Sequence, residues 1–156
     1  MDLTAEVDTS APAPQLFGWI DDLGRYPDWL TLVARAQPAE AHRDDIGPAW
    51  SVDLRARLGP LARAKRLRMV RTTHDPSRLV VFERREHDAR NHSPWVLRAE
   101  VAETTGGGSR LVMRLHYGGG LFGPVVERLL RDEIDRSRPR LAALSAGDPM
   151  PDGPTG

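Results

Sequence analysis

The sequence predicts an α+β domain in which an antiparallel sheet of about six or seven strands is covered on one face by helices. Two observations support this fold class. Apolar and polar residues alternate in a series of short segments that are joined by tight turns, as in antiparallel strands. Helical periodicity appears only near the N-terminus and after the last of these segments. Strands that follow one another through short turns pair antiparallel, and their apolar face needs a helical cover.

The N-terminal elements are predicted to be a strand and two short helical segments. Residues 3–9 alternate between apolar and polar side chains, which is the period of a half-buried strand. Ser10 is an N-cap candidate for an amphipathic helix over residues 12–22, since proline is tolerated in the first turn of a helix. Gly24 ends this helix, and residues 25–30 are expected to form a second, shorter helical turn.

Further strands are expected between these helices and the C-terminal region. The turns between them contain Gly-Pro, Asp-Pro-Ser and Gly-Gly-Gly, which are strong turn signals. On the best-patterned strands, one set of alternating side chains is apolar and is expected to face the helices. The predicted strands span residues 32–41, 49–58, 62–73, 78–86, 94–104 and 110–117.

A long C-terminal helix is predicted over residues 121–144, because apolar side chains recur at helical spacing from Phe122 onward. Pro139 lies inside this segment and should kink or locally break the helix, since proline lacks the N–H that helical bonding requires. Residues 1–145 are therefore expected to form one domain. Residues 146–156 are expected to form a disordered tail, because they contain little apolar surface to bury.

Composition and charge exclude several classes of function. The chain has 156 residues, of which 40% are hydrophobic and 28% charged, which is typical of a single globular domain. Its 22 basic residues balance its 22 acidic residues, so we expect no nucleic-acid partner. The absence of cysteine excludes disulfides, thiolate metal sites and cysteine nucleophiles. No apolar run reaches the ~18 residues of a membrane span, and the acidic N-terminus does not resemble a signal peptide, so a cytoplasmic protein is expected. The oligomeric state cannot be inferred from these features.

Residues 9–33, TSAPAPQLFGWIDDLGRYPDWLTLV, resemble the opening segment of the START-like superfamily, which includes polyketide cyclases and dehydrases and Bet v 1-like proteins. The resemblance depends on a strand followed by a helix and a Tyr-Pro-x-x-Trp-like element at residues 26–29. DPSRLVVF at 75–82, the segment 95–117 and the C-terminal amphipathic helix are also similar to the family. The resemblance implies a helix-grip fold, in which a curved antiparallel sheet wraps around the long C-terminal helix and leaves an apolar cavity between them.

Strand alternation, combined with this implied fold, predicts which side chains line the cavity. Inward-facing strand residues and one face of the C-terminal helix would form its walls, and Trp29 would lie at its entrance. The same side chains could instead fill a solid core. The candidate ligand-binding residues are Trp29, Trp50, Val52, Leu54, Leu67, Met69, Trp95, Leu97, Met113, Leu115, Tyr117, Phe122, Val126 and Leu129.

Candidate catalytic residues are few. The sequence contains no nucleophile elbow, phosphate-binding loop or dinucleotide fingerprint. Tyr117 would place a hydroxyl on the inward face, where it could orient a ligand carbonyl or phenol. Arg71 could hold a ligand oxygen if it continues the inward alternation of Leu67 and Met69. A buried arginine would then need a partner such as Glu83 or an anionic ligand.

Two polar clusters have ordinary explanations. The loop 85–93 contains two histidines and two carboxylates, but it matches no metal-binding spacing. We therefore expect no metal and no cofactor, and interpret this loop as a polar rim at the cavity mouth. Arg66 and Arg68 should project from the outer face of the sheet, where a solvated charged surface is usual, so both should be exposed and dispensable for folding.

The resemblance implies a non-enzymatic or cryptically enzymatic protein that binds a hydrophobic small molecule or lipid in the internal cavity. An alternative is a polyketide cyclase or aromatase that folds a reactive chain in the cavity and adds general acid–base help. A third possibility is a protein-interaction or toxin-like regulatory module. Several polar groups inside the cavity would favour the enzyme, a purely apolar lining would favour carriage, and the absence of a cavity would favour the third possibility.

Overall fold

The described residues form one antiparallel sheet and three helical segments. The computed structural model describes residues 1–58, 61–118 and 124–147, without the side chains of residues 56–58, 61–63 and 124–126. The elements are β1 (Asp2–Thr9), α1 (Ala13–Phe17), the 3₁₀ helix η1 (Leu23–Asp28), β2 (Val33–Pro38), β3 (Ala49–Leu58), β4 (Leu61–Asp75), β5 (Leu79–Arg84), β6 (Trp95–Glu103), β7 (Ser109–Tyr117) and α2 (Pro124–Ala146).

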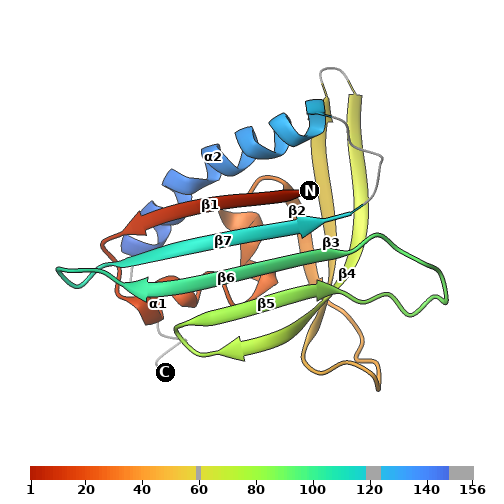
Figure 1. The fold of residues 1–156 in the computed structure, drawn as a ribbon, viewed down its shortest axis with the longest axis horizontal. Coiled ribbons are helices and arrows are strands. Elements are labelled where there is room, and N and C mark those ends of the chain that lie inside the picture. Colours follow the sequence, from red (N-terminus) through yellow and green to blue (C-terminus); the bar gives the residue numbers. More distant parts are fainter. Residues whose placement is uncertain (59–60, 119–123, 148–156) are drawn as a thin grey trace, which may run out of the picture.

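The seven described strands form one sheet in the order β1-β7-β6-β5-β4-β3-β2, so β1 and β2 are its edges. Every neighbouring pair is antiparallel, as predicted. Figure 1 shows that the sheet is strongly curled, with β3 and β4 turning steeply away from the direction of β6 and β7. Strands β2 to β7 follow one another both in sequence and in the sheet, whereas β1 joins the far edge by pairing with β7.

Helices occupy the concave side of the curled sheet. Helix α2 runs alongside β1 and also contacts β3 and α1, so it spans the opening of the curl (Figure 1). Its buried residues Leu130 and Leu141 belong to the same apolar core as Leu16 of α1 and Tyr26 of η1. The helix-grip architecture is therefore confirmed.

The N-terminal helix is shorter than predicted. Regular helix ends at Phe17, and residues 18–20 continue as turns in which Trp19 N–H donates to the Leu16 carbonyl, three residues back. Glycine at position 18 accounts for the early end, because it weakens helix propagation. The N-cap is Pro12 rather than the expected Ser10. The second helical segment begins at Leu23, earlier than predicted, after the Asp22 side chain accepts the Gly24 N–H at 2.8 Å.

The C-terminal helix does not break at Pro139. Helix α2 continues through this residue to Ala146. Pro139 is exposed, so water can hydrate the carbonyl that lacks its helical partner. Residues 148–156, which include most of the predicted tail, lie outside the described residues. No helix within the described ranges is long and apolar enough to cross a membrane.

The outer face of β4 differs from the prediction at one of its two arginines. Arg66 is exposed and pairs with Asp53. Arg68, in contrast, leaves only 16% of its side chain exposed and contacts Asp45, whose side chain is 3% exposed. The expectation that Arg68 is freely solvated is wrong, because residues of the β2–β3 loop fold back over this part of the sheet and place Asp45 against it.

Candidate functional site

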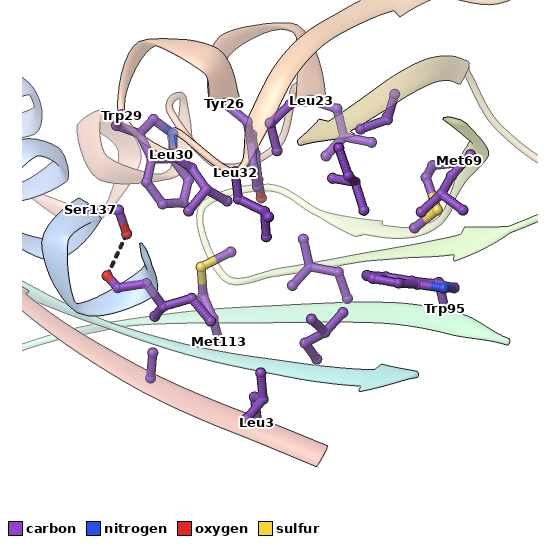
Figure 2. Close-up of a pocket in the computed structure, with 18 of the residues that line it drawn as sticks. Leu3, Leu23, Tyr26, Trp29, Leu30, Leu32, Met69, Trp95, Met113 and Ser137 are labelled. Atoms are coloured by element: carbon purple, nitrogen blue, oxygen red, sulfur yellow. Dashed lines mark hydrogen bonds between the residues drawn. The ribbon is translucent and has the colours of Figure 1, made fainter. Parts of the chain in front are cut away.

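An internal cavity of about 100 Å³ lies between the concave face of the sheet, the η1 region and α2 (Figure 2). The sheet supplies alternating residues from β1, β3, β4, β6 and β7, while Ile134, Ser137 and Arg138 come from α2. The complete lining is Leu3, Ala5, Val7, Leu23, Tyr26, Trp29, Leu30, Leu32, Val33, Val52, Leu54, Leu67, Met69, Trp95, Leu97, Met113, Leu115, Ile134, Ser137 and Arg138.

Most of the strand residues singled out from the sequence lie on this lining. They meet there because strand pairing brings equivalent inward positions into register: Val52 is paired with Leu67, and Leu97 with Leu115. The candidate residues that line the cavity are Trp29, Val52, Leu54, Leu67, Met69, Trp95, Leu97, Met113 and Leu115.

Three other candidates lie elsewhere. Trp50 is buried with its ring edge-on to Phe82, at a centroid separation of 5.6 Å. Tyr117 stacks on Trp95 at 4.9 Å outside the cavity lining, and its hydroxyl lies 3.3 Å from the Met1 sulfur. Leu129 lines a separate surface hollow on α2. Phe122 and the side chain of Val126 lie outside the described residues.

The catalytic candidate Arg71 does not line the cavity either. Its guanidinium donates to the Asp21 carbonyl at 3.2 Å, in the connection between α1 and η1. Arg71 keeps the alternation of Leu67 and Met69, since the register shift of β4 comes after it, but at this end of the sheet the side chain meets the α1–η1 connection instead of the cavity. The suggested partner Glu83 pairs instead with Arg85, at 3.5 Å.

The candidates that sequence reasoning missed come from three segments. Strand β1 contributes Leu3, Ala5 and Val7, which have the correct alternation, but their pairing with β7 is not visible in the sequence. The η1 region contributes Tyr26 and Leu30 among others, and α2 contributes residues one to two turns beyond the predicted ones. The irregular segment after η1 has no simple period, so no pattern could have identified its inward side chains.

The polar groups of the lining are few and mostly engaged. The Tyr26 hydroxyl donates to the Ile20 carbonyl at 2.8 Å, and burial raises the pKa of Tyr26 well above its usual range. The Ser137 hydroxyl donates within α2 to the Ile134 carbonyl at 2.6 Å (Figure 2). Trp95 differs, because its buried Nε1 has no hydrogen-bond partner among the residues that the structure describes. A buried donor without a partner is uncommon in folded proteins and costs free energy.

A cation lies next to Trp95. The Lys65 Nζ lies 5.6 Å from the centre of the Trp95 ring, a cation–π distance. Burial lowers the pKa of Lys65, and the nearby Arg84 lowers it further. Lys65 shares the inward alternation of Leu67 and Met69, so the strand pattern could have identified it.

At the α2 side of the cavity, Arg138 is about half exposed and only weakly paired, 3.7 Å from Asp135.

The chain matches a protein-family model over nearly its whole length. The model is described as polyketide cyclase/dehydrase and lipid transport, and it matches residues 1–146. A search of curated proteins finds no significant match.

Solved structures with the same fold share little sequence with this chain. A START superfamily protein from Mycobacterium smegmatis superposes with a TM-score of 0.68 at 13% identity, covering 91% of this chain and 94% of the other. A protein from Chromobacterium violaceum gives 0.66 at 17% identity, covering 94% and 98%. The Zhui aromatase/cyclase from Streptomyces sp. R1128 gives 0.64 at 12% identity, covering 93% of each chain. At these identities the similarities show the fold alone.

Proposed function

The chain belongs to the polyketide cyclase/dehydrase and lipid transport family, and from this membership we propose that it binds a hydrophobic small molecule or lipid in the cavity beneath α2. The observation that carries the proposal is an internal cavity lined almost entirely by apolar side chains. Ligand pockets in proteins are typically concave and apolar, with a few polar groups that orient the ligand.

The cavity has to widen before it holds such a ligand. Its volume of about 100 Å³ is smaller than the roughly 300–1,000 Å³ of typical small-molecule pockets. Helix α2 forms one wall through Ile134 and Ser137, and its displacement from the sheet would enlarge the cavity. We therefore expect ligand binding to be coupled to a movement of α2.

The energetics allow binding without a charged contact. Burial of about 400 Å² of apolar ligand surface contributes roughly 10 kcal/mol before the costs of association. A micromolar dissociation constant corresponds to about −8 kcal/mol, so micromolar affinity is a reasonable expectation.

One part of the ligand is expected to accept a hydrogen bond. Trp95 lines the cavity, and its buried N–H has no partner within the described part of the chain, so a ligand carbonyl or carboxylate oxygen that reaches it would satisfy it. Lys65 above the same ring would favour an oxygen that carries negative charge.

Carriage is favoured over enzymatic cyclisation. A cyclase or aromatase needs a group that can move protons. Among the described lining residues there is no aspartate, glutamate, histidine or cysteine, and the Tyr26 and Ser137 hydroxyls already donate to backbone carbonyls.

The proposal is tested by tryptophan fluorescence and calorimetry with a panel of fatty acids, sterols and aromatic polyketide-like compounds. We expect saturable, micromolar binding of at least one class. Leu54→Phe narrows the cavity and should weaken binding, whereas Arg66→Gln on the outer face should not. The absence of saturable binding by both methods across the panel would overturn the proposal.

A second variant tests the polar contact. Trp95→Phe keeps an aromatic ring but removes the N–H donor. It should weaken binding of a carbonyl-bearing ligand by about two- to tenfold, the usual range for one hydrogen bond, relative to a hydrocarbon of the same shape. Equal losses for both ligands would show that Trp95 acts only through packing.

A further inference from the structure

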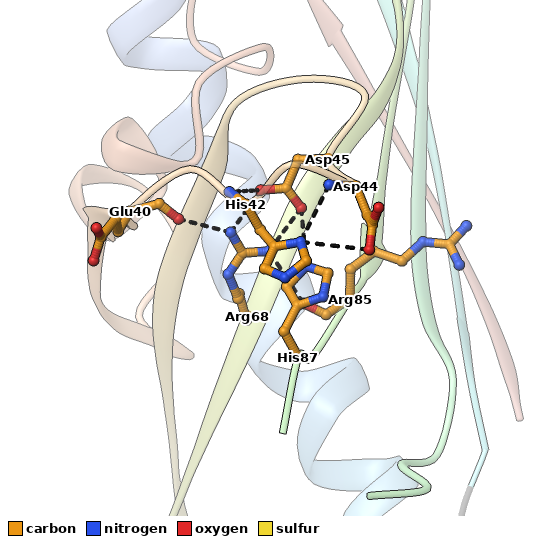
Figure 3. Close-up of polar contacts among 7 residues, drawn as sticks. All are labelled: Glu40, His42, Asp44, Asp45, Arg68, Arg85 and His87. Atoms are coloured by element: carbon orange, nitrogen blue, oxygen red, sulfur yellow. Dashed lines mark hydrogen bonds and ion pairs between the residues drawn. The ribbon is translucent and has the colours of Figure 1, made fainter. Parts of the chain in front are cut away.

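A second polar site lies on the outer face of the sheet, away from the cavity. There the loop between β2 and β3 meets the start of the loop that follows β5, and His42, Asp44 and His87 come together (Figure 3). One potential ligand atom from each of these side chains lies within 4.8 Å of the other two. The histidine rings stack with centroids 3.5 Å apart and planes 7° apart.

A buried carboxylate orients one of these histidines. His87 Nε2 lies 3.2 Å from Asp45 Oδ1, and Asp45 also accepts the His42 backbone N–H at 2.9 Å. The Arg68 guanidinium binds both oxygens of Asp45, at 2.9 and 2.6 Å, and fixes this carboxylate in place. Because His87 Nε2 is held by Asp45, the other ring nitrogen of His87 is the one that can bind an ion.

We propose that His42, Asp44 and His87 bind a divalent transition-metal ion, with Zn²⁺ as the ion that best suits the donors. Two imidazoles and a carboxylate are characteristic zinc ligands. A histidine that donates its second N–H to a carboxylate, as His87 does to Asp45, is the usual arrangement around a bound metal.

The three side chains need only a small rearrangement. Ligand atoms on a tetrahedral zinc lie about 3.4 Å apart, given bond lengths near 2.0–2.1 Å. One ligand atom of each side chain already lies within 4.8 Å of the other two, so the three side chains have to draw together to share one ion. The stacked rings must also splay so that their nitrogens point to one centre. His42, Asp44 and His87 all have solvent-accessible side chains, so rotation about their side-chain bonds can achieve both changes.

The site keeps room for a further ligand. Asp44 and His87 also line a surface hollow of about 440 Å³ that is bordered by Thr72 and Arg85. Three protein ligands leave at least one position of the ion for water or a small anion, and this hollow is where it would lie. The ion would also link the β2–β3 and β5–β6 loops.

Zinc binding is measured on the full chain without a histidine tag, by calorimetry in a buffer that does not chelate metals. We expect one saturable site per chain. His87→Ala and Asp44→Asn should each weaken zinc binding by about tenfold or more. His92→Ala should leave it unchanged, because His92 pairs with Asp88 in the same loop outside the cluster. Cobalt provides a second readout, since tetrahedral Co²⁺ gives intense visible absorption that His87→Ala should abolish.

Circular dichroism shows whether each variant is folded, and Asp44→Asn is the safest of them because 70% of the Asp44 side chain is exposed. The proposal is overturned if zinc does not bind saturably. It is also overturned if Asp44→Asn and His87→Ala bind zinc as the wild type does, or if His92→Ala causes the larger loss.

Discussion

Replacement of Arg68 by glutamine should destabilise the protein, because it leaves the Asp45 carboxylate without its counter-ion. Arg68 binds both Asp45 oxygens, and it also donates to the carbonyls of Glu40 at 2.8 Å and Arg85 at 3.3 Å. Asp45 lies almost entirely out of solvent, so water cannot replace these bonds without a rearrangement of the β2–β3 loop.

The expected loss of stability lies between the values known for exposed and for fully buried ion pairs. Exposed ion pairs contribute at most about 1 kcal/mol, whereas breaking a fully buried pair costs roughly 3–5 kcal/mol. The Arg68 and Asp45 side chains are 16% and 3% exposed, and Asp45 retains its bonds from His42 and His87. We therefore expect Arg68→Gln to lower the free energy of unfolding by about 2–3 kcal/mol at pH 7.

The effect should also depend on pH. The pKa of Asp45 is lowered in the folded protein, so its stabilisation is present above the unfolded value near 3.9 and is lost as the pH falls through the folded value. The difference in stability between wild type and Arg68→Gln should therefore be present at pH 7 and shrink below about 4.

Urea unfolding followed by circular dichroism, repeated at several pH values, measures the loss in free energy of unfolding and its dependence on pH. Arg66→Gln is the matched control, since Arg66 lies two residues away on the same strand face and pairs with Asp53 while remaining 72% exposed. It should leave the urea midpoint unchanged. Equal midpoints for Arg68→Gln and Arg66→Gln, or a difference that grows as the pH falls, would refute the reasoning.

Two further predictions concern the space around a glycine and a buried hydrogen bond. Gly47→Ala should destabilise the protein by about 1–3 kcal/mol in the same assay, because a Cβ there would lie 2.2 Å from the Arg71 carbonyl oxygen. Gly18→Ala is the control and should leave stability unchanged, because its Cβ would lie no closer than 3.6 Å to any neighbouring atom. Equal losses of stability in Gly47→Ala and Gly18→Ala would contradict the packing argument. Tyr26→Phe removes the buried hydrogen bond to the Ile20 carbonyl and should lower the thermal midpoint, with a loss of about 1 kcal/mol. An unchanged midpoint would show that this bond contributes no net stability.

Local periodicity determined the elements and most of their faces. The alternation around Val52, Leu67, Leu97 and Met113 identified strands and their inward side chains, because a strand's two faces are set by a period of two residues. The long helix followed in the same way from its 3.6-residue period. These inferences require only neighbours in sequence, and the structure places all four residues on the cavity lining.

Only the tertiary structure decided which distant segments meet. Strand β1 pairs with β7, more than a hundred residues away, and thereby brings Leu3 to the cavity wall. The β2–β3 loop folds over β4, which buries Arg68 against Asp45 and sets His42 beside His87. Contacts between segments that are distant in sequence depend on how many residues pack together across the whole fold. The charges and turn residues of one segment do not reveal which partner they will meet. The sequence therefore predicted most of the cavity's strand lining, but it did not predict which residues of α2 complete that lining or that a polar cluster forms outside it.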